Sequence, residues 1–233
     1  MVLIVAAMVI YTAFFNQSDC DDQATWGFKD SVITNDIWNK GQRQGRQCVT
    51  ADGWNWDWPN GGSDVISFPH VEYGFSSWQQ ESTTPVLPRQ VRQIKRVNVN
   101  FKHLVSASGI GETTFMMWFN SEPAPTESNL IAQVMVWTEN RGRSPSGADG
   151  PTIRADNRTF RQISTKTHGR DLVIFIPDRP LDGGELDLGI FVNALVAQHH
   201  LDPGSYLSDI DFGDEISSGR GTEKILKLDY LFN

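Results

Sequence analysis

The chain consists of short segments in which apolar and polar positions alternate, separated at short intervals by Pro and Gly. Six of these segments are rich in β-branched and aromatic residues: VISFPHVEYGF (65–75), RVNVNFKHLV (96–105), TTFMMWF (113–119), IAQVMVW (131–137), DLVIFIP (171–177) and KILKLDYLF (224–232). Such segments are typical of strands, and their spacing favours an antiparallel sandwich over βαβ units. We therefore predict an all-β fold, a jelly-roll sandwich of two curved antiparallel sheets.

One stretch departs from this pattern and predicts a helix. In LDLGIFVNALVAQHHLDPG (186–204), Phe191 and Leu195 are four residues apart, acidic residues precede them, and Pro203-Gly204 ends the run. This is the spacing of an amphipathic helix with a defined start and stop. We expect a helix from about Leu188 to His200, packed on the outside of one sheet.

Alternation also assigns faces to two of the strands, because successive side chains of a strand point to opposite sides. The wholly apolar faces suit the core between the sheets: Phe115, Met117 and Phe119 in 113–119, and Ala132, Val134 and Val136 in 131–137. The opposite faces mix aromatic and polar groups and suit a ligand-binding groove: Thr114, Met116 and Trp118, and Gln133, Met135 and Trp137.

Composition narrows the class of protein. A length of 233 residues is enough for one domain with a large core. Lys and Arg total 20 against 28 Asp and Glu, so the net charge is -8. Nucleic acid needs a basic surface, so we expect no nucleic-acid partner, whereas a neutral glycan is compatible with this charge. The eight tryptophans are explained either by core packing or by a row of flat surfaces on which sugar rings stack.

The first 15 residues, MVLIVAAMVIYTAFF, are almost wholly apolar. This run is shorter than the roughly 20 residues that span a bilayer, and its length is typical of a secretory signal. No Lys or Arg precedes Lys29, so the usual basic start of such a signal is missing. We expect residues 1–19 to be an export leader, with a short anchor at the cell surface as the alternative. Residues 20–233 would then form a single domain of a secreted, extracellular protein, which we expect to be a monomer.

The two cysteines, Cys20 and Cys48, form one disulfide in the simplest reading of an exported protein. Such a bond would close a loop of about 27 residues and contribute on the order of 3 kcal/mol. Two unrelated buried thiols are the alternative.

Five motifs, in this order and spacing, resemble glycoside hydrolase family 12, whose members are endo-β-1,4-glucanases and xyloglucanases built on a β-jelly roll. NDIWN (35–39) resembles the N-x-x-W strand, and WDWPNGGSDVISFPHVEYG (56–74) resembles W-x-W followed by YP-x-[VI]-x-[YF]G. FMMWFNSEPAP (115–125) is similar to YDIWF, QVMVWTENRGRSPSG (133–147) to E-[IL]-M-[IV]-W with P-x-G, and FGDEISSG (212–219) to the late G-x-E segment. The resemblance covers nearly the whole chain after Cys20.

The resemblance implies retaining hydrolysis, in which one Glu attacks the anomeric carbon and a second acts as acid and base. The acid/base position falls on Glu215, and the nucleophile position falls on Gln133. The acidic residue that supports the nucleophile in the family falls on Met116. A carboxamide carries no negative charge and does not readily form the glycosyl–enzyme ester, and a thioether is a weak acceptor. We therefore predict that hydrolysis is lost or severely impaired.

Loss of the nucleophile need not remove binding of the glucan. The resemblance places these residues in the substrate groove: Asp36, Trp38, Trp56, Trp58, Trp78, Trp118, Met135 and Trp137. The first hypothesis is a secreted protein that binds cellulose, mixed-linkage glucan or xyloglucan without cutting it. The second is an active endo-β-1,4-glucanase in which Asp36 or Glu139 replaces the missing carboxylate. The third is a jelly-roll lectin or interaction protein with an unrelated ligand.

The other candidate residues suggest little chemistry. His199 and His200 lack the second ligand cluster that zinc spacing requires, so we assign no metal site and no cofactor. His70, His103 and His168 are scattered along the chain, without a nucleophile–base arrangement. Arg141 and Arg143 are expected in an exposed loop.

Overall fold

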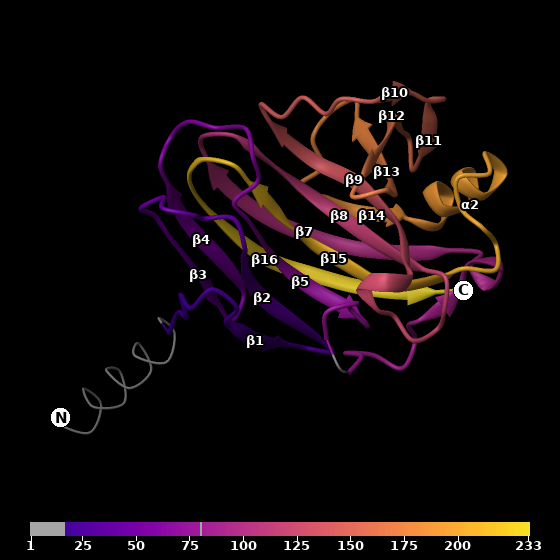
Figure 1. Cartoon of the computed structure of the whole chain (residues 1–233), viewed down its shortest axis with the longest axis horizontal. Coiled ribbons are helices and arrows are strands. Elements are labelled where there is room, and N and C mark those ends of the chain that lie inside the picture. The colour runs from indigo at the N-terminus through magenta and orange to yellow at the C-terminus, as the bar shows by residue number, and fades with distance from the viewer. Residues whose placement is uncertain (1–16, 80) are drawn as a thin grey trace.

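The computed structural model of the protein describes residues 17–79 and 81–233, whose strands form two sheets (Figure 1). The apolar run 1–15 lies outside the described residues, so the leader or anchor stays a prediction. Among the described residues, no helix is both long and apolar enough to cross a bilayer.

The larger sheet contains eleven strands, and most of its neighbours pair antiparallel, with β13 beside β9 as a parallel pair. Its main path runs β1-β2-β5-β15-β8-β9-β13-β12-β10. The strands are β1 (Thr25–Phe28), β2 (Ser31–Ile37), β5 (Ser67–Gly74), β6 (Arg89–Gln90), β8 (Gly111–Asn120), β9 (Leu130–Arg141), β10 (Ala148–Asp149), β11 (Ile153–Ala155), β12 (Arg158–Thr167), β13 (Arg170–Pro177) and β15 (Tyr206–Ile216).

The smaller sheet contains five strands in the order β14-β7-β16-β4-β3. They are β3 (Arg46–Thr50), β4 (Gly53–Trp58), β7 (Val97–Ala107), β14 (Gly183–Asp187) and β16 (Gly219–Phe232). Two short 3-10 turns, η1 (Val91–Gln93) and η2 (Glu127–Asn129), lie in the connections. All six segments predicted as strands are therefore strands, and the predicted two-sheet jelly-roll sandwich is confirmed.

The core lies between the two sheets, because each sheet turns its apolar face toward the other. The ring of Phe115 from β8 packs 5.1 Å from Phe101 of β7 and 4.5 Å from Phe212 of β15, measured between ring centroids. The faces predicted for β8 and β9 are confirmed. The core includes Phe115, Met117, Phe119, Ala132, Val134 and Val136, whereas Met116 and Met135 belong to a separate cluster on the other face of the sheet.

Helix α2 (Gly189–Ala197) lies at one end of the sandwich, near β11 to β13 (Figure 1). Its Phe191 packs 4.8 Å from Phe175 of β13 and 4.9 Å from Phe160 of β12, so the predicted apolar face is the buried one. The helix ends three residues before the predicted position at His200. His199 adopts a φ of 61°, and this left-handed backbone conformation cannot continue a right-handed helix.

A buried acid–base pair connects β7 and β16 of the smaller sheet. His103 Nδ1 lies 2.6 Å from Oε1 of Glu223, and His103 Nε2 lies 2.9 Å from the carbonyl oxygen of Leu181, to which it donates. Burial opposes the charged imidazole, but Glu223 outweighs it and raises the pKa of His103. Burial, with the charge of Asp214, raises the pKa of Glu223 to about 7. From the short distance and the two raised pKa values, we infer that the two groups share a proton.

We expect this proton to make stability depend on pH. An unfolded histidine releases its proton near pH 6.5, whereas the folded pair keeps the proton to higher pH. The pair therefore contributes its full stabilising free energy below pH 6.5, and this contribution is lost as pH rises through the folded-state pKa of His103. The slope approaches about 1.4 kcal/mol per pH unit. Urea unfolding of wild type and Glu223→Gln at pH 6 and pH 8 measures it. The amide preserves the hydrogen bond without titrating, so an equal pH dependence in both proteins would contradict the assignment.

Candidate functional site

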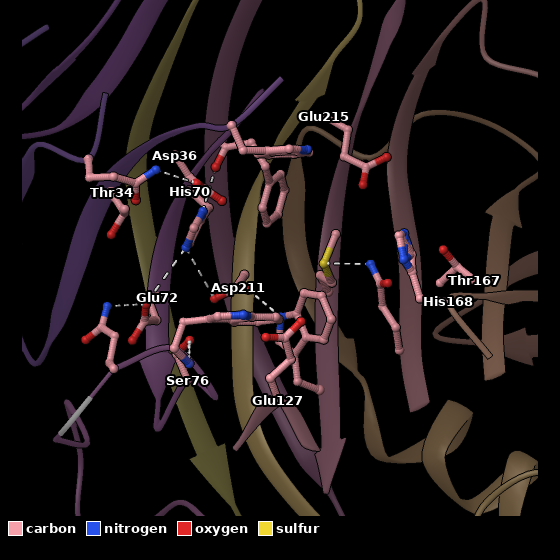
Figure 2. A pocket seen from close by; sticks show the side chains of 18 of the residues that line it. Thr34, Asp36, His70, Glu72, Ser76, Glu127, Thr167, His168, Asp211 and Glu215 are labelled. Carbon is pink, nitrogen blue, oxygen red and sulfur yellow. Dashed lines mark hydrogen bonds and ion pairs between the residues drawn. The ribbon is translucent and has the colours of Figure 1, made fainter. Parts of the chain in front are cut away.

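A groove of about 610 Å³ lies on the face of the larger sheet that turns away from the core (Figure 2). Its floor comes from β2, β5, β15, β8 and β9, each of which contributes alternate residues because every second side chain of a strand points to the same face. The lining includes these residues predicted from the sequence: Asp36, Trp38, Trp78, Met116, Trp118, Gln133 and Glu215. Residues distant in the sequence thus meet on one surface.

Gln133 of β9 enters the groove beside Met116 of β8. Its Nε2 lies 2.9 Å from Sδ of Met116, a contact drawn as a dashed line to the yellow sulfur in Figure 2. The amide donates to a thioether, which is a weak acceptor. The positions predicted for the nucleophile and its supporting acid are therefore neighbours in space, and neither carries a carboxylate.

Glu215 of β15 lines the same groove (Figure 2) and forms an ion pair with Arg143. Nη2 of Arg143 is 3.4 Å from Oε2 of Glu215, and Nε of Arg143 is 2.9 Å from Oε2 of Glu112. Glu112 is fully buried, and this burial together with the nearby Glu215 raises its pKa well above the usual carboxyl range. Arg143 thus joins the predicted acid/base residue to a second carboxyl group behind it.

The expectation of an exposed loop is wrong for Arg141, which ends β9, whereas Arg143 lies in the following loop with its side chain 23% exposed. Nη2 of Arg141 lies 2.6 Å from Oδ1 of Asp214, and the Arg141 side chain is 9% exposed. The sequence shows two arginines in a Gly- and Ser-containing stretch, which is typical of a solvated turn. Only the fold brings the buried acids of β8 and β15 within their reach.

Three tryptophans offer surfaces to a ligand in the groove. Trp38 and Trp78 are 53% and 54% exposed, which is unusual for so large an apolar side chain. Trp78 contacts the half-buried Trp118 edge to face, with ring centroids 5.1 Å apart. Indole faces stack on the C–H faces of sugar rings, so this part of the predicted binding set lies where a glycan could reach it.

The placement of Trp56 and Trp58 in the groove is wrong. Both belong to β4 of the smaller sheet and are 4% and 2% exposed within the core. Together with Trp54 they stand at every second position of β4, so all three point to the same face, toward the larger sheet. Nε1 of Trp54 donates to Oδ2 of Asp214 at 2.7 Å, across the core.

Met135 and Trp137 lie on the predicted side of β9 but do not line the groove. They are 2% and 1% exposed, in a small cluster with Phe68, Met116 and Ile174. Neighbouring side chains cover them, so they are not positioned to contact a substrate, and that assignment is corrected. The cluster supports the floor of the groove from below.

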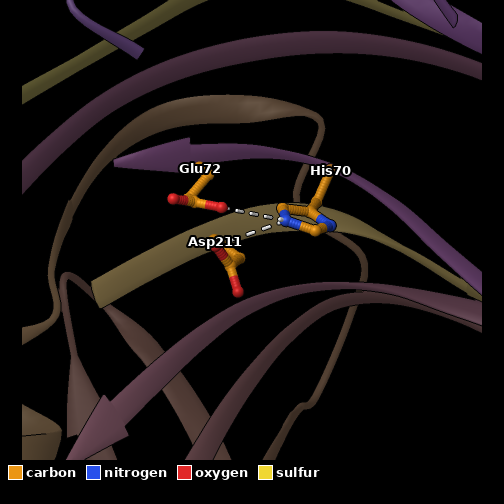
Figure 3. Close-up of side chains that lie close together, drawn as sticks. All are labelled: His70, Glu72 and Asp211. Atoms are coloured by element: carbon orange, nitrogen blue, oxygen red, sulfur yellow. Dashed lines mark ion pairs between the residues drawn. The ribbon is translucent and has the colours of Figure 1, made fainter. Parts of the chain in front are cut away.

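A second group of polar residues lies in the groove floor. Of this group, the sequence indicates only His70, as one of several scattered histidines, and does not connect it with Glu72 or Asp211. His70 and Glu72 of β5 and Asp211 of β15 place one ligand atom each within 4.8 Å of one another (Figure 3). Burial alone would lower the pKa of His70, but Asp211, Glu72 and Asp36 outweigh it and raise the pKa to about 9. Burial raises the pKa of Asp211 to about 7, against the opposing effect of His70.

The sequence does contain a local pattern for this group: His-x-Glu in β5 and Asp-x-Asp in β15. Residues two apart in a strand share a face, so each pattern puts potential metal ligands on one face of its strand. The pairing of the two strands could not be read from the sequence. Asp211 lies opposite Glu72 only because β15 and β5 are neighbours.

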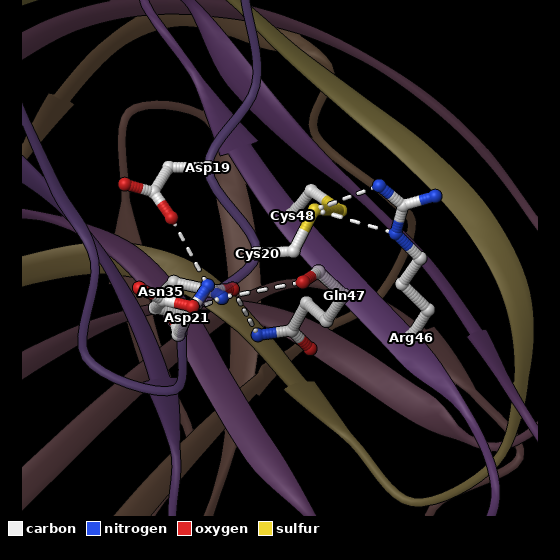
Figure 4. The surroundings of a disulfide bond; sticks show 7 residues. All are labelled: Asp19, Cys20, Asp21, Asn35, Arg46, Gln47 and Cys48. Atoms are coloured by element: carbon white, nitrogen blue, oxygen red, sulfur yellow. Dashed lines mark hydrogen bonds between the residues drawn. A yellow bond between two sulfur atoms is a disulfide. The ribbon is translucent and has the colours of Figure 1, made fainter.

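A disulfide lies close in sequence to a residue that lines the groove (Figure 4). Cys20 and Cys48 are joined, so the predicted bond is confirmed and ties the segment before β1 to β3. Within the closed loop, Gln23 lines the groove and its Nε2 donates to Oδ1 of Asp36 at 2.8 Å. The bond therefore holds the segment that orients Asp36.

The two sheets and the groove agree with what comparison with known proteins finds. The model of glycosyl hydrolase family 12 matches residues 29–230, so the chain belongs to this family. Endoglucanase S of Pectobacterium parmentieri is 21% identical over 232 residues, which cover 94% of this chain and 87% of that protein.

Solved structures of the same family share the fold. A family 12 xyloglucanase from Bacillus licheniformis superimposes with a TM-score of 0.86 at 21% identity, covering 93% of this chain and 100% of the other. Endoglucanase cel12A from Rhodothermus marinus gives a TM-score of 0.80 at 18% identity, covering 94% and 99%. At these identities the likeness extends to the backbone, and the chemistry must be inferred from this chain's own side chains.

Proposed function

We propose that this protein binds β-1,4-glucan in the groove and that its hydrolysis of the glucan is lost or severely impaired. The contact between Gln133 and Met116 carries the proposal. A retaining glycosidase needs an ionised carboxylate at the nucleophile position, both to form the glycosyl–enzyme bond and to stabilise the oxocarbenium-like transition state. An amide held by a thioether supplies neither function.

The other carboxylates in the groove already have partners, which supports the proposal. Glu139, considered as a substitute, pairs with Arg141 at 3.3 Å and does not line the groove. Three carboxylates that line the groove accept hydrogen bonds: Glu72 from Gln79, Asp211 from Trp118, and Asp36 from Gln23. A fourth, Glu127, forms an ion pair with Arg170.

Binding is supported by the exposed indoles of Trp38 and Trp78 and by family membership. The three relatives described above are named endoglucanase or xyloglucanase, and these names denote action on glucans. We also propose that the protein is exported and acts as a monomer. The disulfide supports export, because such bonds persist mainly in oxidising compartments.

We expect wild type to bind barley β-glucan or xyloglucan while releasing no reducing sugar above the level of Glu215→Gln. Trp78→Ala is expected to weaken binding about tenfold, because stacking on one indole buries roughly 60 Å² of apolar surface at about 25 cal/mol per Å². Leu104→Ala is the matched control, since Leu104 is 54% exposed on the smaller sheet. Affinity electrophoresis in gels containing each polysaccharide measures binding.

The outcomes separate the three hypotheses. Binding without sugar release agrees with the proposal. Clear turnover by wild type would show an active endoglucanase, and absence of binding to either polysaccharide would favour a lectin or interaction protein with another ligand.

One observation favours the active enzyme as a second candidate. Asp36 of β2 lies opposite Phe68 of β5. On the other side of β5, the register with β15 puts Glu215 level with Phe68. Asp36 and Glu215 are therefore two strand spacings apart, or about 10 Å between backbones. Carboxyl groups about 6.5–9.5 Å apart leave room for an attacking water and give inversion. An Asp36-dependent activity would therefore release sugar of inverted anomeric configuration, which proton NMR of fresh product detects.

A further inference from the structure

Three potential metal-binding side chains project from two neighbouring strands into one point of the groove floor (Figure 3). His70 and Glu72 are two residues apart on β5, so both face the groove. Asp211 of β15 is paired opposite Glu72. His70 and Glu72 occupy the two unspecified positions of the P-x-[VI]-x-[YF]G pattern, so the family resemblance assigns them no role.

The imidazole of His70 is oriented as a metal ligand is. Its Nδ1–H donates to the carbonyl oxygen of Phe68 at 2.6 Å, which directs Nε2 toward the two acids. A backbone carbonyl on the second nitrogen is the usual support of a metal-bound histidine. Stacking on the ring of Phe68, with centroids 4.7 Å apart, further restricts the imidazole.

His70 lies too far from the two acids for direct hydrogen bonds, at distances that suit an ion bound between them. His70 Nε2 lies 3.7 Å from Oδ1 of Asp211 and 3.9 Å from Oε2 of Glu72. Both distances exceed the range of a hydrogen bond to nitrogen. Two ligands at about 2.0–2.1 Å from one tetrahedral zinc ion lie roughly 3.4 Å apart, so the imidazole would need to approach each acid by a few tenths of an ångström. All three ligand atoms already lie within 4.8 Å of one another.

The carboxylates also have unused acceptor capacity away from water. Within residues 17–79 and 81–233, Oδ1 of Asp211 and Oε1 of Glu72 have no hydrogen-bond partner, although their side chains are only 5% and 3% exposed. Oδ2 of Asp211 accepts from Trp118, and Oε2 of Glu72, the oxygen 3.9 Å from His70, accepts from Gln79, each at 2.7 Å, which fixes the carboxylates in place. The free oxygen that faces His70 is therefore Oδ1 of Asp211. Buried carboxylate oxygens without a partner are costly, and a cation removes that cost.

We propose that His70, Glu72 and Asp211 bind a divalent transition-metal ion, with Zn²⁺ as the best-fitting probe. Two carboxylates balance the charge of such an ion. One imidazole nitrogen with two carboxylate oxygens is a donor set that Zn²⁺ accepts, whereas Ca²⁺ and Mg²⁺ take oxygen ligands alone.

The site is distinct from the positions predicted for catalysis. Asp211 is four residues before Glu215 on the same strand, about 13 Å along it. All three side chains line the groove, so an ion they hold could take a water or a sugar hydroxyl as its fourth ligand. The ion would then hold a glycan at the groove floor. Metal binding itself does not depend on the proposed glucan-binding function.

Isothermal titration of the full chain with ZnCl₂, after dialysis against a chelator, tests the proposal. We expect one high-affinity ion per chain and at least a hundredfold weaker binding of CaCl₂ and MgCl₂. Asp211→Asn and His70→Gln are each expected to reduce Zn²⁺ affinity at least tenfold. His168→Gln is the matched control, because His168 lines the same groove outside the cluster, and it should bind as wild type does.

Wild type alone can overturn the proposal. Absence of Zn²⁺ binding up to about 1 mM would show that the imidazole is simply paired with the two acids. Equal affinity in wild type, Asp211→Asn and His70→Gln would place any bound zinc elsewhere. Circular dichroism and thermal melting establish that each variant is folded, and Glu72→Gln replaces either variant that is not. A Zn²⁺-dependent rise in melting temperature, lost in the folded variants, provides the independent readout.

Discussion

Replacing Gln133 by Glu and Met116 by Asp together is expected to raise the release of reducing sugar from β-glucan at least a thousandfold above wild type. The first change restores an anion at the predicted nucleophile position, and the second places an acid beside it, where the 2.9 Å contact shows that the side chains already meet. Loss of one member of a catalytic unit costs about 10⁴–10⁶ in rate, so its return can recover a large part of that factor.

Single variants and one triple variant show whether the gain arises as argued. Gln133→Glu alone should recover less, since the thioether of Met116 neither donates a proton nor carries charge. The difference between single and double variants gives the coupling between the two positions. Adding Glu215→Gln should abolish the gain. If the triple variant keeps it, Glu215 is not the acid/base residue, and if wild type already matches the double variant, hydrolysis was never impaired.

The second large effect is on stability: Asp214→Ala is expected to lower the free energy of unfolding by about 3–5 kcal/mol. Asp214 is fully buried and accepts from Thr113 at 2.7 Å, Arg141 at 2.6 Å and Trp54 at 2.7 Å. Trp54 comes from the smaller sheet, so this carboxylate links the two layers. Removing it leaves the largely buried guanidinium of Arg141 with only Glu139, at 3.3 Å, as an ion-pair partner, which is the costly way to break such a pair.

Urea denaturation of Asp214→Ala beside Asp229→Ala measures this cost. Asp229 forms an ion pair of 2.7 Å with Lys29, but its side chain is 52% exposed, so its loss should cost less than about 1 kcal/mol. Similar values for the two variants would show that the buried network contributes no more than a surface pair does.

The strands and the alternation within them could be predicted from the sequence because both are local properties. In β8 and β9, the face that mixes polar and apolar residues is the groove face, as the alternation predicts. The order of the motifs around Gln133 and Glu215 indicates the family. The helix was predicted with an error at its end only, because the left-handed backbone of His199 is not encoded by the apolar spacing.

The misplaced residues share one cause. Trp56 and Trp58 alternate with polar residues, just as groove residues do, and alternation says which side chains share a face without saying which face is covered. Arg143, likewise, was read from its own loop, although its partners Glu112 and Glu215 come from β8 and β15.

The sequence by itself determined the all-β architecture, the absence of a carboxylate at position 133 and the exposed aromatic character of part of the groove. Tertiary structure decided which tryptophans are buried, which acids meet Arg143, and that His70, Glu72 and Asp211 converge. The physical reason is that hydrophobic periodicity depends on neighbours along the chain, whereas burial and ion pairing depend on which strands become neighbours in space.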